Sequence, residues 1–207
     1  LLAARQKRKT PLLDDKVLTS WNGLMIRSLA DGGRVFETPE YTAAAAKAAT
    51  FLVDKLRDPK QGNLLRTYRK GTAKLNAYLV DYAFLVEGLL ALHQATGDDN
   101  WLKQARELTD QQISLFWDKS RHGFYFTSHD HEELLARTQN GFDSVLPSGN
   151  STSVRNLIRL AKRTGDKTYR TYAKQTLEAF APQMREHLGR GGMGMSHMAL
   201  ALAEFLA

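Results

Sequence analysis

The sequence predicts an all-α protein in which helical hairpins follow one another around an axis, an α/α toroid. Three observations predict this fold. One capping pattern recurs at three helix starts, at intervals of 60 and 68 residues. The helix before each of these starts is apolar nearly all round, as in residues 79–92, whereas the helix after it is amphipathic, as in residues 100–117. Such hairpins bury their apolar helices only by stacking on one another, and an open α-solenoid is the competing arrangement.

The recurring pattern places a capping side chain three residues before an aromatic residue. It occurs as Thr38 before Tyr41, Asp98 before Trp101 and Asp166 before Tyr169. Gly97 and Gly165 stand where the preceding helix needs a left-handed terminator. Each point is therefore predicted to be a junction between two helices.

These junctions predict the order of elements along the chain. We expect inner helices over about 21–36, 79–96 and 149–164, outer helices over about 39–57, 99–117 and 167–187, and a seventh helix over 193–206. Alternating patterns predict short strands at 64–69 and 123–128, the second pairing with 133–137 as a hairpin on one rim. Residues 1–207 are then a single domain, a partial barrel.

Composition narrows the function classes. The chain is 43% hydrophobic and 25% charged, with a net charge of +7 dispersed along its helices, so a nucleic-acid partner is not expected. No apolar run reaches the roughly 20 residues of a membrane span, so no membrane partner is expected either. The absence of cysteine excludes disulfides and thiol catalysis, and is compatible with a cytoplasmic location. The start at Leu1, without Met, suggests a piece of a longer protein.

Three segments also resemble a known family. They are the stretch from Arg8 to Ile26, which contains Asp-Asp-Lys-Val-Leu-Thr-Ser-Trp-Asn-Gly-Leu, followed by 81–89 and 147–151. Together they resemble the spermatogenesis-associated protein 20 family, including bacterial YyaL-like proteins. The resemblance covers the whole chain and implies an (α/α)6 barrel of the six-hairpin glycosidase-like and N-acylglucosamine 2-epimerase-like type. It also implies a partner, the thioredoxin-like domain that family members carry N-terminally and that is absent from these residues.

A candidate binding site follows from the register of the junctions. Trp21 aligns with Asp81 and Gly149, and Asn22 aligns with Tyr82 and Asn150, so all six belong to one end of the inner helices. Unpaired N–H groups there favour hydroxyl-rich or anionic ligands. We expect a polar cavity at this rim with a carbohydrate ligand, bound by Trp21, Asn22, Tyr82, Ser148 and Asn150. Each of these side chains could instead simply cap a helix or pack in the core.

Acid–base chemistry needs further groups near the same rim. Glycoside cleavage needs two carboxylates, and we expect Asp81 to pair with Asp15 or Asp143. Epimerisation needs a base and an acid, for which His197 and Tyr82 are available. Glu87, in contrast, aligns with Arg27 and Arg155 on neighbouring inner helices and is predicted to form a buried ionic ladder.

The remaining motifs predict no metal and no cofactor. His129-Asp130-His131-Glu132-Glu133 fits an exposed hairpin tip, and the glycines of 189–194 lack the strand that a dinucleotide site requires. His93 and His187 are expected to be structural. The sequence thus favours a carbohydrate-modifying module, with a non-catalytic binding or scaffold module serving the thioredoxin-like domain as the alternative.

Overall fold

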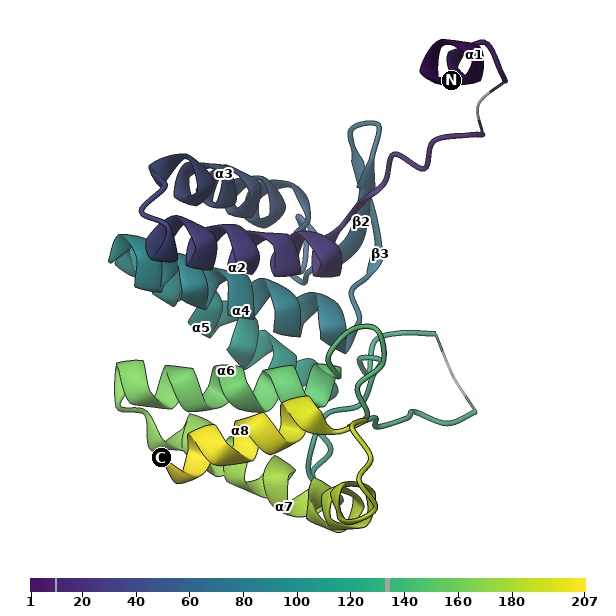
Figure 1. The fold of residues 1–207 in the computed structure, drawn as a ribbon. Helices are drawn as coiled ribbons and strands as arrows, with labels where there is room; N and C mark the ends of the chain where they lie inside the picture. The colour runs from purple at the N-terminus through teal and green to yellow at the C-terminus, as the bar shows by residue number, and fades with distance from the viewer. Residues whose placement is uncertain (10, 133–134) are drawn as a thin grey trace.

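The computed structural model describes residues 1–9, 11–132 and 135–207. Its strands are β1 (Val17–Leu18), β2 (Leu65–Arg69) and β3 (Thr72–Asn76). Its helices are α1 (Leu2–Gln6), α2 (Thr19–Val35), α3 (Pro39–Lys55), α4 (Leu79–Thr96), α5 (Asp99–Phe116), α6 (Gly149–Thr164), α7 (Lys167–Gly189) and α8 (Ser196–Leu206). Helix α1 lies on an arm that stands away from the rest of the chain (Figure 1).

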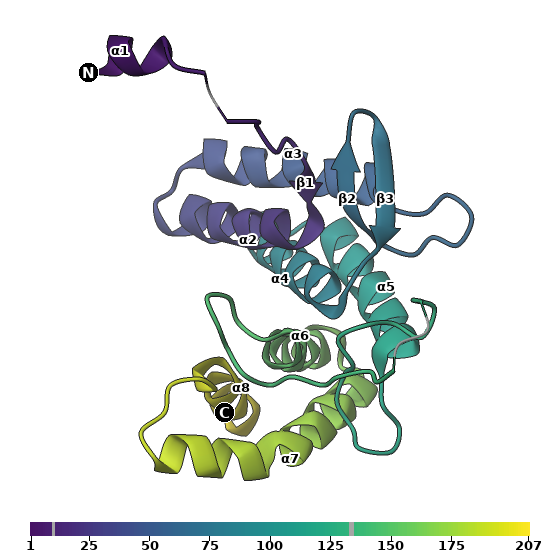
Figure 2. The same ribbon diagram turned by 90° about the vertical axis from the view of Figure 1, so that its right-hand side faces the viewer.

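The helices form two curved layers. Helices α2, α4, α6 and α8 are the inner layer and run parallel, with their N-terminal ends on one side (Figure 1). Helices α3, α5 and α7 run in the opposite direction on the convex side. Figure 2, which looks toward the N-terminal ends, shows the inner helices as an arc that is open on one side. All inner-helix N-termini therefore lie at one rim, as the junctions predicted.

Two glycines allow α2 and α4 to approach closely. A Cβ on Gly23 would lie 2.6 Å from the backbone of Phe84 and Leu85, and a Cβ on Gly88 would lie 2.8 Å from the carbonyl oxygen of Gly23. Because neither distance is possible for a real side chain, this helix pair depends on glycine at both positions. The buried faces of the inner helices, with Ile26, Leu89 and Leu157, form the core.

The helix caps are confirmed at two of the three junctions. The side chains of Asp98 and Asp166 accept hydrogen bonds from the backbone N–H groups of Asn100 and Thr168. Thr38 differs, because its hydroxyl donates to the carbonyl of Phe36, and within the described chain it accepts no capping bond from α3. The prediction that the Thr38 side chain caps α3 was thus wrong. Pro39 at the start of α3 has no N–H, so this helix start has one donor fewer to satisfy.

The strands follow the prediction only in part. The predicted strand at 64–69 is present as β2, which pairs antiparallel with β1 and β3, two pairings that the sequence did not predict. The strand predicted over 123–128 was wrong: its described residues form only an isolated bridge between Phe124 and Trp117. The Gly123 backbone is left-handed, with φ of 93°, and turns the chain there. Of the predicted partner strand 133–137, residues 133 and 134 lie outside the described residues.

Helix α2 begins at Thr19, two residues before the predicted start, because β1 passes directly into it. Over the ranges that the structure covers, no helix combines the length and the apolar character needed to cross a membrane.

Candidate functional site

Asp81 joins the N-terminal ends of α2 and α4. One of its carboxylate oxygens accepts the backbone N–H of Ser20, at 3.0 Å, in the first turn of α2. The other accepts the backbone N–H of Tyr78, at 2.9 Å, and completes the cap of α4. A single carboxylate thus satisfies backbone donors at two neighbouring helix starts.

The Asp81 carboxylate is also buried and paired. Its side chain is fully buried, and the guanidinium of Arg66 on β2 lies 3.3 Å from it. Burial raises the pKa of Asp81, opposed by the hydrogen bond from Tyr78 and the charge of Arg66. The groups around Asp81 are therefore those that hold a helix cap, and a substrate would have to displace one of them to reach the carboxylate.

The other predicted residues of this half of the rim lie in separate environments. Trp21 is 63% exposed on α2. Asn22 donates to the carbonyl of Leu18, one turn back, and Asp15 pairs with Arg69 at the exposed end of β2. Asp15, Trp21, Asn22 and Asp81 do not meet in one pocket.

Tyr82 lies in the core behind the rim. Its hydroxyl accepts the backbone N–H of Leu64, at 2.9 Å, and its ring packs edge-on against Phe116. Burial raises the pKa of Tyr82 to about 12, so this phenol stays protonated at neutral pH.

At the start of α6, Ser148 and Asn150 hold the connection from α5. The Ser148 hydroxyl accepts the backbone N–H of Ser151, which confirms it as the cap of α6. The Asn150 side chain accepts the N–H of Phe124, at 2.8 Å, and donates to the carbonyls of Phe124 and Asn140. These bonds take the place of the strand pairing that the sequence predicted for this segment.

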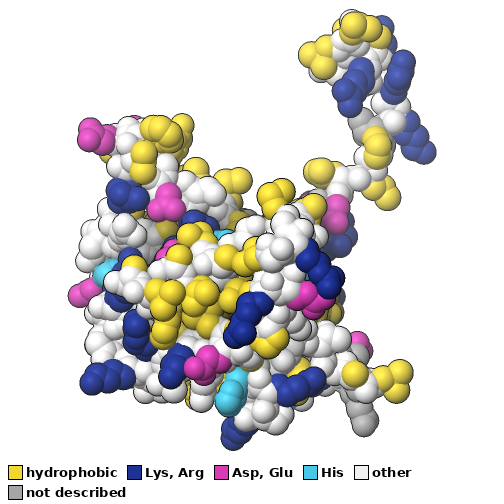
Figure 3. Space-filling model, turned by 60° about the horizontal axis from the view of Figure 1, so that its bottom comes forward, with side chains coloured by type: hydrophobic (Ala, Val, Ile, Leu, Met, Phe, Trp, Pro, Cys, Tyr) yellow, Lys and Arg dark blue, Asp and Glu magenta, His cyan; other side chains and the backbone are white. Residues whose placement is uncertain are grey.

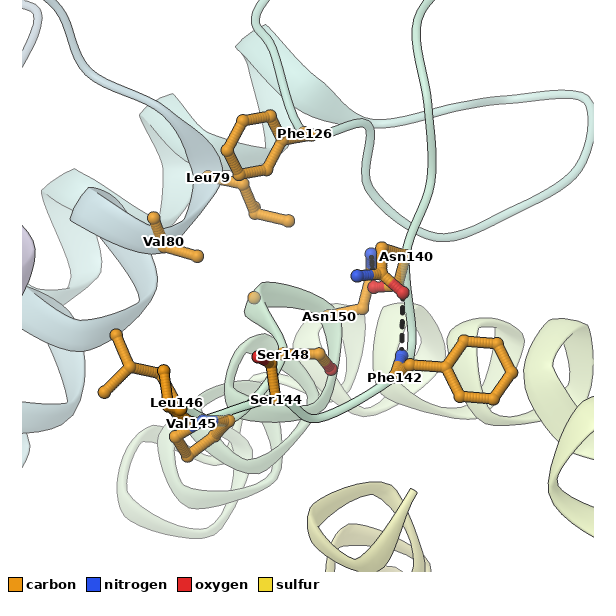
Figure 4. Close-up of a pocket in the computed structure, with 12 residues that line it drawn as sticks. Leu79, Val80, Phe126, Asn140, Phe142, Ser144, Val145, Leu146, Ser148 and Asn150 are labelled. Carbon is orange, nitrogen blue, oxygen red and sulfur yellow. Dashed lines mark hydrogen bonds between the residues drawn. The ribbon is translucent and has the colours of Figure 1, made fainter. Parts of the chain in front are cut away.

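A pocket of about 220 Å³ lies at the rim between the starts of α4 and α6 (Figure 4). Leu79, Val80 and Phe126 form one wall, and Phe142 lies at the opposite end. Polar groups come from the segment before α6 and from its first turn, namely Asn140, Ser144, Ser148 and Asn150. We call this space the rim pocket, and two of the nine predicted site residues, Ser148 and Asn150, line it.

Asp143 and His197 are joined beside the rim pocket. The Asp143 carboxylate accepts the backbone N–H of Ser148, at 3.0 Å, and that of His197 in the first turn of α8, at 2.8 Å. Asp143 therefore links α6 to α8 as Asp81 links α2 to α4. Burial and the charge of Arg155 lower the pKa of His197. Its Nε2 lies 3.0 Å from an Arg155 nitrogen and must accept that bond as a neutral ring, because arginine only donates.

Below the rim, an ionic cluster crosses all four inner helices. Glu87 on α4 lies 3.0 Å from Arg27 on α2 and 3.3 and 3.6 Å from Arg159 and Arg155 on α6. Arg155 also binds Glu204 on α8, at 2.7 Å. We call these five residues, with His197, the Glu87 cluster. The predicted ladder is confirmed, with Arg159 and Glu204 as members that the sequence did not predict.

The sequence missed most of the walls of the rim pocket. Phe126, Asn140, Phe142 and Ser144 belong to the connection between α5 and α6, which has no periodic pattern to place them. Phe126 stacks on Tyr78, with ring centroids 4.9 Å apart.

In the histidine-rich segment 129–133, His131 also stacks on Tyr78, with ring centroids 5.1 Å apart, whereas Glu133 lies outside the described residues. Within those residues, no three side chains are grouped as a metal would require.

Two comparisons identify relatives of this chain. Residues 85–200, more than half of its length, match the family model described as Glycosyl hydrolase family 47. Over 195 residues the chain is 38% identical to spermatogenesis-associated protein 20 of Mus musculus, and it is 38% identical to that of Homo sapiens. The chain belongs to both families. The alignment covers 89% of this chain and 25% of each relative, so the chain spans about a quarter of their length.

Solved structures confirm the fold. The cellobiose 2-epimerase of Spirochaeta thermophila matches with a TM-score of 0.66 at 21% identity, over 83% of this chain and 44% of that one. A family 76 α-mannanase of Bacteroides thetaiotaomicron matches with a TM-score of 0.66 at 17% identity, over 86% and 46%. This chain, a member of the spermatogenesis-associated protein 20 family, thus has the α/α-toroid fold of these epimerase and glycoside hydrolase structures.

Proposed function

We propose that this chain carries a carbohydrate-binding site in the rim pocket, as part of a carbohydrate-modifying α/α barrel. The observation that carries the proposal is the composition of the pocket, in which aromatic and aliphatic walls face amide and hydroxyl groups at two adjacent inner-helix starts. A sugar offers an apolar ring face and hydroxyl edges, which match these two kinds of surface. The fold shared with sugar epimerases and glycoside hydrolases supports this class of ligand.

The acid–base groups of such a site would be Asp143 and His197. Asp143 binds the backbone of Ser148, which lines the pocket, and His197 is held on the other side of the Asp143 carboxylate. The one acceptor nitrogen of the neutral His197 ring already binds Arg155, so His197 could abstract the proton next to a carbonyl only after Arg155 moves away from it. Asp81 and Asp15 are less suited as a pair, because Asp81 is buried in helix caps and Asp15 lies before β1, where it pairs with the exposed Arg69.

The test is sugar binding by the full-length protein, followed by saturation-transfer NMR over a panel of mono- and disaccharides. Phe126, which is 39% exposed in the pocket wall, is changed to Ala, and Phe36→Ala is the control because Phe36 is 73% exposed and lies outside the pocket. We expect Phe126→Ala to weaken binding about tenfold, the effect of losing one buried aromatic contact. Unchanged binding in Phe126→Ala would contradict the proposed site.

The products formed from a bound sugar distinguish the reactions. Deuterium uptake at C2 of a reducing sugar in heavy water indicates epimerisation, whereas new reducing ends indicate hydrolysis.

A non-catalytic module is the second candidate. The observation that favours it is that Asp81, Asp143 and Glu87 are all engaged by backbone N–H or guanidinium groups, which hold helices together. Such a module would bind a ligand or position the thioredoxin-like domain of its family without transforming a substrate. It predicts sugar binding or domain contact with no turnover, and His197→Asn then leaves binding unchanged.

A further inference from the structure

A second cavity lies at the opposite end of the inner helices from the rim pocket. It has a volume of about 70 Å³ and lies near the C-terminal ends of α2, α4 and α6. Its polar lining is Arg27, Asp31, Gln94, Arg159 and Arg163. We call it the basal cavity. A space of this size holds about two water molecules or one small ion.

Positive charge exceeds negative charge around the basal cavity. The guanidiniums of Arg27 and Arg159 share Glu87 with Arg155, and Asp31 lies 3.6 Å from Arg27 and is also 3.9 Å from Arg34. Glu204 serves Arg155 and Arg159. Four guanidinium groups thus share three carboxylates, and Arg163 adds a fifth guanidinium without a carboxylate of its own in the described ranges. His197 adds no charge when neutral.

Arg163 is the least satisfied of these groups. Its one hydrogen bond goes to the amide oxygen of Gln94, at 3.4 Å, and among the described residues no carboxylate lies within 4.0 Å of it. Burial lowers the pKa of Arg163, and burial together with the charge of Arg155 lowers the pKa of Arg159. A half-buried guanidinium without a carboxylate partner can gain a counter-ion, and its planar donors suit oxyanions.

We propose that the basal cavity binds a small tetrahedral oxyanion, held by Arg159 and Arg163 with Arg27 on the opposite wall. The ion supplies the missing negative charge between α2, α4 and α6 and ties their C-terminal ends together. This site is separate from the rim pocket and does not depend on the proposed sugar function.

The position of Arg163 has a simpler explanation that the test must separate from the proposal. Arg163 and Lys162 both stand in the last turn of α6, where a cation complements the helix dipole. Lys162 is exposed and does not line the basal cavity. Lys162→Gln therefore removes the same charge from the same helix end and is the matched control for Arg163→Gln.

The experiment titrates inorganic phosphate into the full-length protein at constant ionic strength and measures binding by calorimetry and the shift in Tm. We expect the unchanged protein and Lys162→Gln to bind phosphate, and Arg163→Gln to bind it about tenfold more weakly, since a charge-assisted contact is lost. Gln94→Glu places a carboxylate beside Arg163, so it is expected to raise Tm without phosphate and to abolish the response to phosphate.

Two results would overturn the proposal. One is an equal response to phosphate in the unchanged protein and in both Gln variants at positions 162 and 163, which is a general salt effect. The other is a response to a hexose monophosphate with none to inorganic phosphate, which assigns recognition to the sugar and not to the free ion.

Discussion

Glu87 joins three of the inner helices through ion pairs. It is fully buried, and three guanidiniums from α2 and α6 surround one of its oxygens. Removing the negative charge leaves these three arginines with only Asp31 and Glu204 as carboxylate partners in the part of the chain that the structure describes, and leaves the buried centre of the cluster without a counter-charge. We expect Glu87→Gln to lower the free energy of unfolding by about 3–5 kcal/mol, as for other broken buried pairs.

Urea unfolding measures this loss. The control is Glu178→Gln on the exposed face of α7, where the pair with Lys174 is 62% exposed on both sides. This change is expected to stay within about 0.5 kcal/mol. If both variants lost the same small amount, the Glu87 cluster would not be a stabilising centre.

His197 gives the stability of the protein a pH dependence. Burial and Arg155 lower its pKa from the ordinary value of 6.5, so the folded protein resists protonation where the unfolded chain accepts a proton. The stabilising contribution is therefore present above pH 6.5 and is lost as the pH falls through the lowered pKa. We expect stability to fall more steeply from about pH 8 to 5 in the unchanged protein than in His197→Asn. Parallel profiles from urea unfolding would contradict this assignment.

How far single residues could be predicted depended on periodicity. Glu87, Arg27 and Arg155 lie on regular helices, so alignment of the junctions was enough to bring them together. The walls that the sequence missed belong to Phe126 and to 140–146, and there side-chain hydrogen bonds such as those of Asn150 to Phe124 and Asn140 replace regular pairing. No pattern in the sequence reveals such bonds. The bonds by which Asp81 joins α2 to α4 were not predicted for the same reason, because they connect a side chain to the backbone of another helix.

At the scale of elements, the contact between α2 and α4 requires glycine. A methyl group on Gly23 would overlap the backbone of α4, at 2.6 Å. We expect Gly23→Ala to lower the free energy of unfolding by about 1–3 kcal/mol, the range found for overpacked cores. Thermal and urea unfolding provide the measurement.

Gly32→Ala on the same helix is the control for this close approach. Its new Cβ would meet Tyr41 at 3.7 Å, an ordinary contact. Since alanine favours a helix, Gly32→Ala is expected to stabilise the protein by about 0.5–1 kcal/mol. If the free energy of unfolding falls in Gly23→Ala and rises in Gly32→Ala, steric overlap is separated from helix propensity. A change of the same sign in both variants would count against the steric argument.

Two predicted helix caps, Ser148 before α6 and Thr38 before α3, differ in the bonds that their side chains form. The Ser148 hydroxyl accepts the backbone N–H of Ser151 in α6, whereas the Thr38 hydroxyl donates to the carbonyl of Phe36, before α3. Ser148→Ala should therefore cost about 1 kcal/mol, and Thr38→Ala should stay within about 0.5 kcal/mol. Equal losses by urea unfolding would show that Thr38 caps α3 in solution.

The elements that were predicted well are those with local signals. Helix starts at Asp98, Ser148 and Asp166 carry their own caps, and the ends at Gly97 and Gly165 are left-handed glycines. The pairing of β1 with β2 joins residues about 50 positions apart, and no turn signal connects them. Local chemistry thus predicted the helical layers, while the small sheet at the rim depended on contacts distant in sequence.

At the scale of the whole molecule, the two edge helices of the inner layer differ from the two central ones. Trp21 and Met25 on α2 are 63% and 57% exposed, and Leu200 and Leu206 on α8 are 46% and 76% exposed. In the part of the chain that the structure covers, α4 and α6 expose no large apolar side chain. Figure 3 shows apolar side chains gathered on the lower face, with basic and acidic groups around them.

Exposed apolar faces at both ends of an arc suit further hairpins of the same fold, because each hairpin buries its inner helix only against neighbours. The solved toroids support this expectation, since this chain covers less than half of each. In the full-length protein we therefore expect Trp21 to be buried against another hairpin. With Trp101, Trp117 and every tryptophan outside these 207 residues replaced by Phe, Trp21 emission should be blue-shifted and resist acrylamide quenching in the full-length protein, but not in the 207-residue chain. Equal quenching in both would mean that the α2 edge stays open and that the toroid is not completed on this side.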